Sequence, residues 1–337
     1  MKTQNFLSLL VLCLLVAQAP EKLLAQNLPA QMTFHVTDDS SNPISGLGFA
    51  LGSWVSPAWN VSATVTNSFG STDSNGNLTL SFLSENGMMG FGTKFGTTGY
   101  YGTHDDYQFK KSSDGKWQPW NPTVNVIVKP ILNPIPMYAL AVGRAPLMDL
   151  PSKNLSVGFD LEAGDFVAPY GKGTVSDFIL NLTEKVPFVS YSQPFDISLN
   201  LSFSNKGDGI QSFLAPLNHG SALRLPRHAP EGGYQPTLVQ ETSRSSDGKV
   251  LNNQFNQEQN YFFRVRTVLD ESGNVKSALY GKISGPLSYD FINSKNKTAL
   301  MFFTYYLNPN PNDRNMEFDP SKNLFQNLTD DQQVKAP

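Results

Sequence analysis

Residues 195–203 read FDISLNLSF, and this stretch decides the fold class of the chain. Every odd-numbered position is apolar and every even-numbered position is polar. A helix of 3.6 residues per turn cannot place such a set on one face, whereas a β-strand places alternate residues on opposite faces. The stretch therefore predicts a strand with one buried and one solvated face.

Further strands are predicted on both sides of this stretch. One pair is joined by residues 270–274, DESGN, a five-residue hairpin connection. Together the strands predict a larger β-sandwich or jelly-roll-like domain over residues 152–326, followed by a flexible polar tail at 327–337. The predicted strands lie at residues 157–161, 175–182, 195–203, 237–240, 261–269, 275–283 and 299–307.

The N-terminal third predicts a separate small β-sandwich over residues 30–130. About seven short strands fit between its turn signals, which include residues 72–77, TDSNGN, and residues 113–116, SDGK. A proline-dense, apolar stretch at 131–151 follows. Because proline cannot donate to a strand ladder, this stretch is predicted to be a linker or a strap packed on a domain surface.

The first residues have the pattern of a secretory signal peptide. Lys2 precedes an apolar run from Phe6 to Ala17, which is shorter than the roughly 20 apolar residues of a membrane span. Cleavage after Ala25 is favoured over cleavage after Ala17, and a short buried helix is the alternative. We therefore expect residues 1–25 to be removed and the product to reach the periplasm or the extracellular space.

Composition excludes several classes of function. The only cysteine, Cys13, lies in the apolar run, so the mature chain is expected to form no disulfide, thiolate nucleophile or Cys-ligated metal site. The formal net charge is −3, only 16% of residues are charged, and no basic run occurs, so nucleic acid is not an expected partner. The sequence contains no second apolar segment that would predict a membrane span.

Several turn motifs of the N-terminal third resemble one known family. Residues 34–38 (FHVTD) and 42–46 (NPISG) are followed by TDSNG at 72–76 and KFGTTGY at 94–100. These segments resemble the opening strand and turns of carboxypeptidase regulatory-like, transthyretin-like domains, although Ser41-Asn42 replaces the first glycine of the pattern. The resemblance covers about residues 32–129. It implies a transthyretin-like or immunoglobulin-like sandwich that accompanies other domains without catalysing a reaction.

No catalytic, cofactor or metal motif is complete. A Gly-x-Ser-x-Gly elbow is missing, and both Ser-x-x-Lys matches fall in SSDGK hairpin tips. GKGT at 171–174 lacks the spacing of a phosphate loop. His104-Asp105-Asp106 alternates in direction if extended, and the calcium-like spacing of residues 73–77 lacks the required later ligands. The sequence thus predicts a protein that is not an enzyme and holds no cofactor or metal.

Two sets of side chains remain as candidates for function. Asp160 and Asp165 could form a carboxylate pair, which leaves open a carbohydrate-active hydrolase in the second domain. All four tryptophans, in contrast, lie in the first domain. Exposed rings on loops bind sugars by stacking, whereas buried rings belong to the core, and the core alternative is stronger for the second pair. The candidate ligand-binding residues are Trp54, Trp59, Trp117 and Trp120.

The sequence thus predicts a secreted, non-catalytic binding or scaffold protein of the bacterial cell envelope. A glycan or another envelope component is the expected partner.

Overall fold

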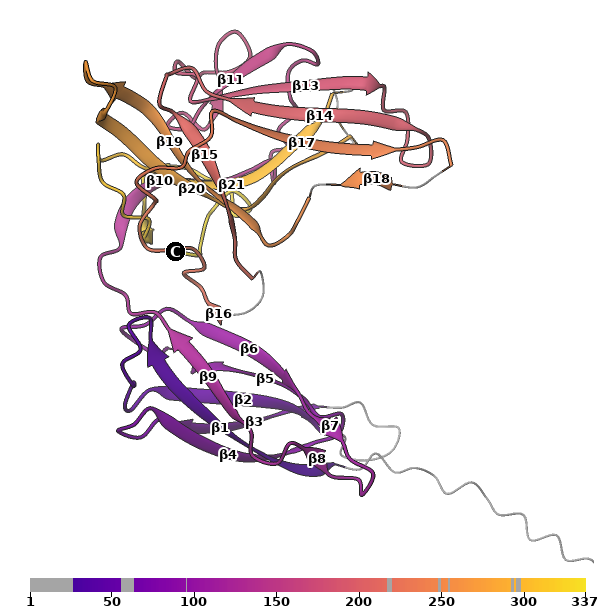
Figure 1. Cartoon of the computed structure of the whole chain (residues 1–337), viewed down its shortest axis with the longest axis vertical. Coiled ribbons are helices and arrows are strands. Elements are labelled where there is room, and N and C mark those ends of the chain that lie inside the picture. The colour runs from indigo at the N-terminus through magenta and orange to yellow at the C-terminus, as the bar shows by residue number, and fades with distance from the viewer. Residues whose placement is uncertain are drawn as a thin grey trace, which may run out of the picture.

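The computed structural model describes residues 27–55, 64–94, 96–216, 220–247, 250–253, 255–291, 294 and 298–337. The expected signal peptide and Trp59 lie outside these residues. Every secondary-structure element of the described residues is a β-strand, so the all-β prediction is confirmed. In the same part of the chain, no helix has the length and apolar character needed to cross a membrane. Figure 1 shows two β units arranged end to end along the long axis.

The first unit packs a three-stranded sheet against a five-stranded sheet. The strand order is β4-β1-β9 in one and β16-β6-β5-β2-β3 in the other. Between them, the Phe34 ring lies 4.8 Å from that of Phe49 and 4.9 Å from that of Phe91, measured between centroids. The strands are β1 (Leu28–Asp38), β2 (Gly48–Val55), β3 (Thr64–Ser71), β4 (Asn77–Ser84), β5 (Met88–Thr93), β6 (Thr103–Gln108), β7 (Lys110–Lys111), β8 (Trp117–Gln118) and β9 (Thr123–Val128).

The predicted turn at residues 72–77 is present. The Asp73 carboxylate accepts hydrogen bonds from the backbone N–H groups of Asn75 and Asn77, both at 2.8 Å. Gly76 has a φ of +76°, and a Cβ there would lie 2.4 Å from the carbonyl oxygen of Val36. Only glycine therefore fits this turn against β1.

The second unit packs two six-stranded sheets face to face. The strand orders are β12-β11-β13-β14-β17-β18 and β15-β19-β20-β21-β10-β22. Strand β14, which lies between β13 and β17 in its sheet, confirms the alternation over residues 195–202, because its apolar side chains are buried and the polar ones between them are only partly buried. The strands are β10 (Ile135–Val142), β11 (Ser156–Asp160), β12 (Asp165–Phe166), β13 (Phe178–Val186), β14 (Phe195–Ser202), β15 (Gly209–Leu214), β16 (Gly220–Ser221), β17 (Thr237–Arg244), β18 (Val250–Asn253), β19 (Gln259–Leu269), β20 (Val275–Asp290), β21 (Leu300–Asn308) and β22 (Phe318–Asn323).

The proline-dense stretch is not only a linker or surface strap. Its residues 135–142 form β10, which lies inside a sheet between β21 and β22. Pro136 is tolerated because the pairing with β22 shifts register between Ile135 and Met137. A proline at such an irregularity removes no ladder hydrogen bond.

The tail at 327–337, predicted to be flexible, makes contacts with the second unit. Val334 is buried in an apolar cluster that covers the outer face of the β20-β21-β10 sheet. The backbone N–H of Ala141 donates to the carbonyl oxygen of Gln332 at 3.1 Å. The tail's polar composition concealed this role, because the sheet face that it covers is distant in sequence.

Candidate functional site

The outer face of the five-stranded sheet carries an unusual pattern of side chains. The register of β3, β2, β5 and β6 places twelve outward-facing residues in three rows across the strands. In the first two rows the middle positions are small, because Ala50, Gly52, Gly90 and Gly92 occupy them. In strand order the rows read Phe69, Ala50, Gly92, His104; then Asn67, Gly52, Gly90, Asp106; then Val65, Trp54, Met88, Gln108.

These rows form a trough, which we call the glycine trough. Its floor is Ala50, Gly52, Gly90 and Gly92. A hollow of about 280 Å³ lies over this floor on the side of β6, where Thr103, His104, Asp105 and Asp106 line it. One side is lined by Asn67 and Phe69 and the other by His104 and Asp106, while Trp54, Val65 and Met88 close one end. With strands about 4.8 Å apart, the two sides are separated by roughly 14 Å between backbones. The floor is therefore wide enough for a ring-sized group.

Polar side chains reach over the glycine floor. A Cβ at Gly52 would lie 3.2 Å from Oδ1 of Asn67, and a Cβ at Gly90 would lie 3.2 Å from Oδ1 of Asp106. A Cβ at Gly92 would lie 2.2 Å from the carbonyl oxygen of Thr103. Only glycine therefore fits at position 92, and the Asn67 amide and the Asp106 carboxylate lie against the floor from its two sides.

The apolar side of the trough is exposed. Trp54 is 44% exposed and Phe69 is 58% exposed. The Lys94 ammonium lies 5.8 Å from the centroid of the Phe69 ring. Single exposed apolar residues are common on protein surfaces, so the rings make this face a candidate through their position beside the floor of small residues and not through exposure alone.

The structure separates the four predicted tryptophans. Trp54 lies in the glycine trough. Trp117 belongs to the core: it is 5% exposed and its indole N–H donates to the carbonyl oxygen of Ser84 at 3.1 Å. Trp120 is 53% exposed but is not part of the trough, and Trp59 lies outside the described residues. The core alternative therefore holds for Trp117, which no ligand can reach by stacking.

Asp160, the first carboxylate of the hydrolase alternative, is fully engaged. Its Oδ1 accepts the backbone N–H groups of Glu162 and Ala163, and its Oδ2 accepts those of Thr174 and Val175. Burial alone would raise the pKa of Asp160, but these bonds outweigh it and hold the pKa below the ordinary value. A carboxyl group in this state cannot donate a proton at neutral pH.

Arg266 completes this buried cluster. Its guanidinium contacts Asp160 at 3.3 Å, Asp177 at 2.8 Å and Glu162 at 2.9 Å. Asp165 lies opposite Asp160 on β12, and its Oδ2 accepts the backbone N–H of Lys172 at 3.2 Å. The carboxylates thus hold the turn at 171–174 against the sheet, which explains the pair as a structural element.

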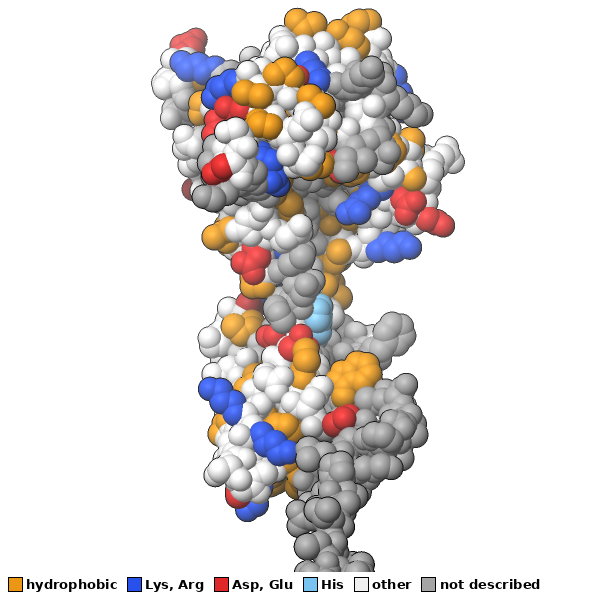
Figure 2. Space-filling model, turned by 90° about the vertical axis from the view of Figure 1, so that its right-hand side faces the viewer, with side chains coloured by type: hydrophobic (Ala, Val, Ile, Leu, Met, Phe, Trp, Pro, Cys, Tyr) orange, Lys and Arg blue, Asp and Glu red, His pale blue; other side chains and the backbone are white. Residues whose placement is uncertain are grey.

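His104 and Asp106 point outward from β6, with Asp105 between them. Within the described residues, no group of three or more His, Cys, Asp and Glu side chains is placed to hold a metal ion. On the face drawn in Figure 2, blue and red side chains are scattered over both units and do not gather into a patch of one sign.

The two units are joined by a buried polar cluster at Glu317, which we call the junction cluster. Glu317 accepts hydrogen bonds from the Tyr101 hydroxyl and the Leu132 and Asn133 backbone N–H groups, each at 2.9 Å. Arg227 contacts it at 2.5 Å. Burial alone would raise the pKa of Glu317, but these donors outweigh it and lower the pKa. Sequence reasoning missed this cluster, because its members are dispersed along the chain.

A strand pairing between the two units adds to the junction. Strand β16 comes from the second unit and pairs with β6, where Gly220 lies opposite His104. The Ala222 N–H donates to the carbonyl oxygen of Gly102 at 2.7 Å. The polar side of the glycine trough is therefore next to the junction between the units, as the position of β16 in Figure 1 shows.

Comparison with known proteins gives no family. No family model matches the chain, and no curated protein matches it. Among solved structures, a streptococcal ancillary pilin is 12% identical over 82% of this chain, with a TM-score of 0.22, and the match spans 58% of the pilin's length. A DUF3823 family protein of Parabacteroides merdae is 8% identical over 82% of this chain and 96% of its own, with a TM-score of 0.21. The major pilin subunit of Bacillus cereus is 13% identical over 82% and 95%, with a TM-score of 0.22.

Proposed function

We propose that this chain is a secreted, non-catalytic protein of the bacterial cell envelope that binds a glycan in the glycine trough. One observation carries the proposal: a floor of small residues lies between strand β3, which carries the exposed Phe69 ring, and strand β6, which carries His104 and Asp106, with the exposed Trp54 at one end. The leader-like sequence at residues 1–25 supports secretion. The resemblance of the first unit to carboxypeptidase regulatory-like domains supports a non-catalytic role.

The chemistry of the trough matches that of a sugar ring. A pyranose has apolar C–H faces and a rim of hydroxyl groups. Trp54 and Phe69 offer aromatic faces that can stack on the C–H faces of the sugar. Aromatic contacts of this kind combine apolar area with fixed geometry. Asp106 and Asn67 offer a carboxylate and an amide to the sugar hydroxyl groups. These two side chains can accept and donate hydrogen bonds on both sides of the ring.

The shape of the trough suits a chain rather than a single sugar. The floor residues follow β2 and β5, so the trough runs along the strands. It is an open hollow on the sheet face, and an enclosed pocket would be needed to bury most of a monosaccharide. A polysaccharide segment can lie along the floor and leave at the end opposite Trp54.

The hydrolase alternative has no support in the geometry of Asp160. Both of its carboxylate oxygens are occupied by backbone donors and by Arg266, so neither is available as a nucleophile or proton donor. The cluster has a structural role instead, which is to hold the turn at 171–174 against the sheet.

A glycan array with the purified full-length mature chain tests the proposal. We expect binding to a polysaccharide fragment, with no release of reducing ends from it. Replacing Trp54 with alanine should weaken binding by about 1–3 kcal/mol, as for an aromatic hot spot. Trp120→Ala is the matched control, because it removes a similarly exposed indole of the same unit outside the trough. Absence of glycan binding, or equal losses in both variants, would show that the trough is not the site.

A further inference from the structure

A second hollow lies on the second unit, at an irregularity between β20 and β21. Ser284 lies opposite Thr304 and Ser288 lies opposite Phe302, so β20 carries two extra residues between these pairs. Gly285 within the bulge has a φ of +85°. Its backbone N–H donates to the side chain of fully buried Asn260 at 2.9 Å, so the bulge is held in place from below.

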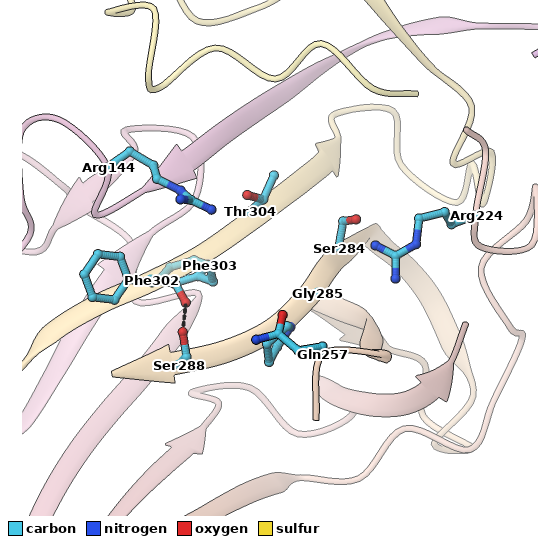
Figure 3. Close-up of a pocket in the computed structure, with 10 residues that line it drawn as sticks. Arg144, Arg224, Gln257, Ser284, Gly285, Ser288, Phe302, Phe303 and Thr304 are labelled. Carbon is cyan, nitrogen blue, oxygen red and sulfur yellow. Dashed lines mark hydrogen bonds between the residues drawn. The ribbon is translucent and has the colours of Figure 1, made fainter. Parts of the chain in front are cut away.

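The bulge opens a cavity of about 320 Å³ on the outer face of the sheet. In Figure 3, Arg144 and Arg224 point toward this cavity from opposite sides. The hydroxyls of Ser284 and Thr304 lie between them, and the Phe302 ring forms part of the wall. No acidic side chain is among the described residues that line it. Two cations therefore face one cavity without a lining carboxylate.

The backbone of Arg144 is fixed at the edge of the cavity, and its guanidinium group is free to bind a ligand. It is exposed and has no hydrogen bond or ion pair with any described residue. The preceding Gly143 has a φ of +82°, and a Cβ there would lie 1.8 Å from the carbonyl oxygen of Met301. This close approach to β21 fixes the turn that presents Arg144.

Arg224 is oriented by the backbone. Its Nε donates to the carbonyl oxygen of Pro216 at 2.9 Å, and its Nη2 donates to that of Ala215 at 3.1 Å. Its Nη1 is left for a ligand. Burial lowers the pKa of Arg224, and the nearby Tyr306 and Glu258 offset this only in part.

We propose that this cavity binds a sugar-sized molecule that carries an oxyanion, either a carboxylate or a phosphate. Arg144 binds the oxyanion through its planar fork of N–H donors, and Nη1 of Arg224 donates from the other side. Ser284, Thr304 and Gln257 pair with hydroxyl groups of the ligand, and Phe302 covers an apolar face. The volume lies at the lower end of the range for small-molecule pockets, about 300–1,000 Å³.

The cavity and the glycine trough bind different classes of ligand. The trough carries a carboxylate at Asp106, whereas the cavity carries two guanidinium groups. The inference therefore does not depend on the function proposed for the trough, and the two can fail separately.

Isothermal titration of the full-length mature chain tests the inference. The probes are galacturonic acid, galactose 6-phosphate and neutral galactose. We expect at least one acidic sugar to bind about tenfold or more tightly than galactose, because charge-assisted bonds to arginine exceed neutral ones. The stronger acidic probe shows whether carboxylate or phosphate is preferred. Equal affinity for galactose, or no binding of either acidic sugar, overturns the proposal.

Three variants locate the binding. Arg144→Gln should weaken binding of the acidic sugar by about tenfold, since it removes the charge and the fork. Lys206→Gln, which neutralises an exposed cation elsewhere on the unit, is the matched control and should change nothing. Trp54→Ala should also leave this affinity unchanged. An unaltered affinity in Arg144→Gln, or an equal loss in the control, places the ligand elsewhere and refutes the site. Thermal melts should show Arg144→Gln folded, because the residue packs on nothing that the change removes.

Discussion

Replacing Glu317 with glutamine should uncouple the two β units. The side chain is fully buried, and its two oxygens accept four donors: the Tyr101 hydroxyl, the N–H groups of Leu132 and Asn133, and Arg227. Glutamine has one acceptor oxygen, so its NH₂ group must face a former donor. The substitution also leaves the Arg227 cation without its buried partner.

The magnitude follows from these contacts. Removing one partner of a buried ion pair costs about 3–5 kcal/mol. An orphaned buried N–H costs about 1–3 kcal/mol, and this contribution is already part of the larger figure. Arg227 keeps a hydrogen bond to the carbonyl oxygen of Pro130 at 2.9 Å and a 3.5 Å contact with Asp39. We therefore expect the lower end, a loss of about 3 kcal/mol in the free energy of unfolding.

Differential scanning calorimetry and urea denaturation are the assays. The parent chain should unfold in one transition, because the units share the junction cluster, whereas Glu317→Gln should show two. Glu231→Gln is the matched control: it pairs with Arg314 at 2.9 Å but is 83% exposed. A surface pair of this kind contributes about 0–1 kcal/mol. The reasoning fails if Glu317→Gln keeps one transition and loses no more stability than the control.

The Glu317 carboxylate also makes the free energy of unfolding depend on pH. The pKa of Glu317 is lower in the folded protein than its ordinary value of 4.5. Its contribution to stability is therefore complete above about pH 4.5 and is lost as the pH falls through the folded pKa. The stability difference between the parent and Glu317→Gln should shrink under acid conditions.

Two further predictions concern buried side chains. Burial lowers the pKa of Lys282 to about 7, so the unfolded chain binds the extra proton up to about pH 10. The free energy of unfolding, measured in urea, should therefore rise by about 1 kcal/mol per pH unit above pH 7. Lys282→Met should remove this rise, and parallel pH profiles of the parent and the variant would contradict the prediction. Trp117→Ala should lose about 3–5 kcal/mol of stability, whereas Trp54→Ala should lose less than about 1 kcal/mol; equal losses in urea melts would mean that both rings are core.

The sequence predicts those strands whose burial follows from local alternation. Strand β14 is the clearest case, because its buried side chains are the odd-numbered positions from 195 to 201. Strand β10 could not be predicted in the same way. Residues 135–142 carry Pro136, and their place inside a sheet depends on a register shift against β22, which is more than 170 residues distant.

The candidate site was only partly visible in the sequence. Trp54 could be identified as a candidate by residue type, but the same reasoning also selected Trp117, which is buried. The stronger signal was the spacing of small residues: Ala50 and Gly52, and Gly90 and Gly92, are each two apart and so share a strand face. Their meeting on one floor requires the register of β2 with β5, which no local pattern contains.

The junction cluster and the glycine trough are connected through β6. On one edge of this strand lies β5, which forms part of the trough floor, and on the other lies β16 from the second unit. His104 of the trough is opposite Gly220 of β16, so the polar side of the trough is bounded by the second unit. A buried ion cluster is a weak source of stability, since desolvation offsets its attraction, but it permits few arrangements of its partners. We infer that the junction fixes the relative position of the units. That position in turn keeps His104 of β6 paired on both edges and holds it in place beside the floor.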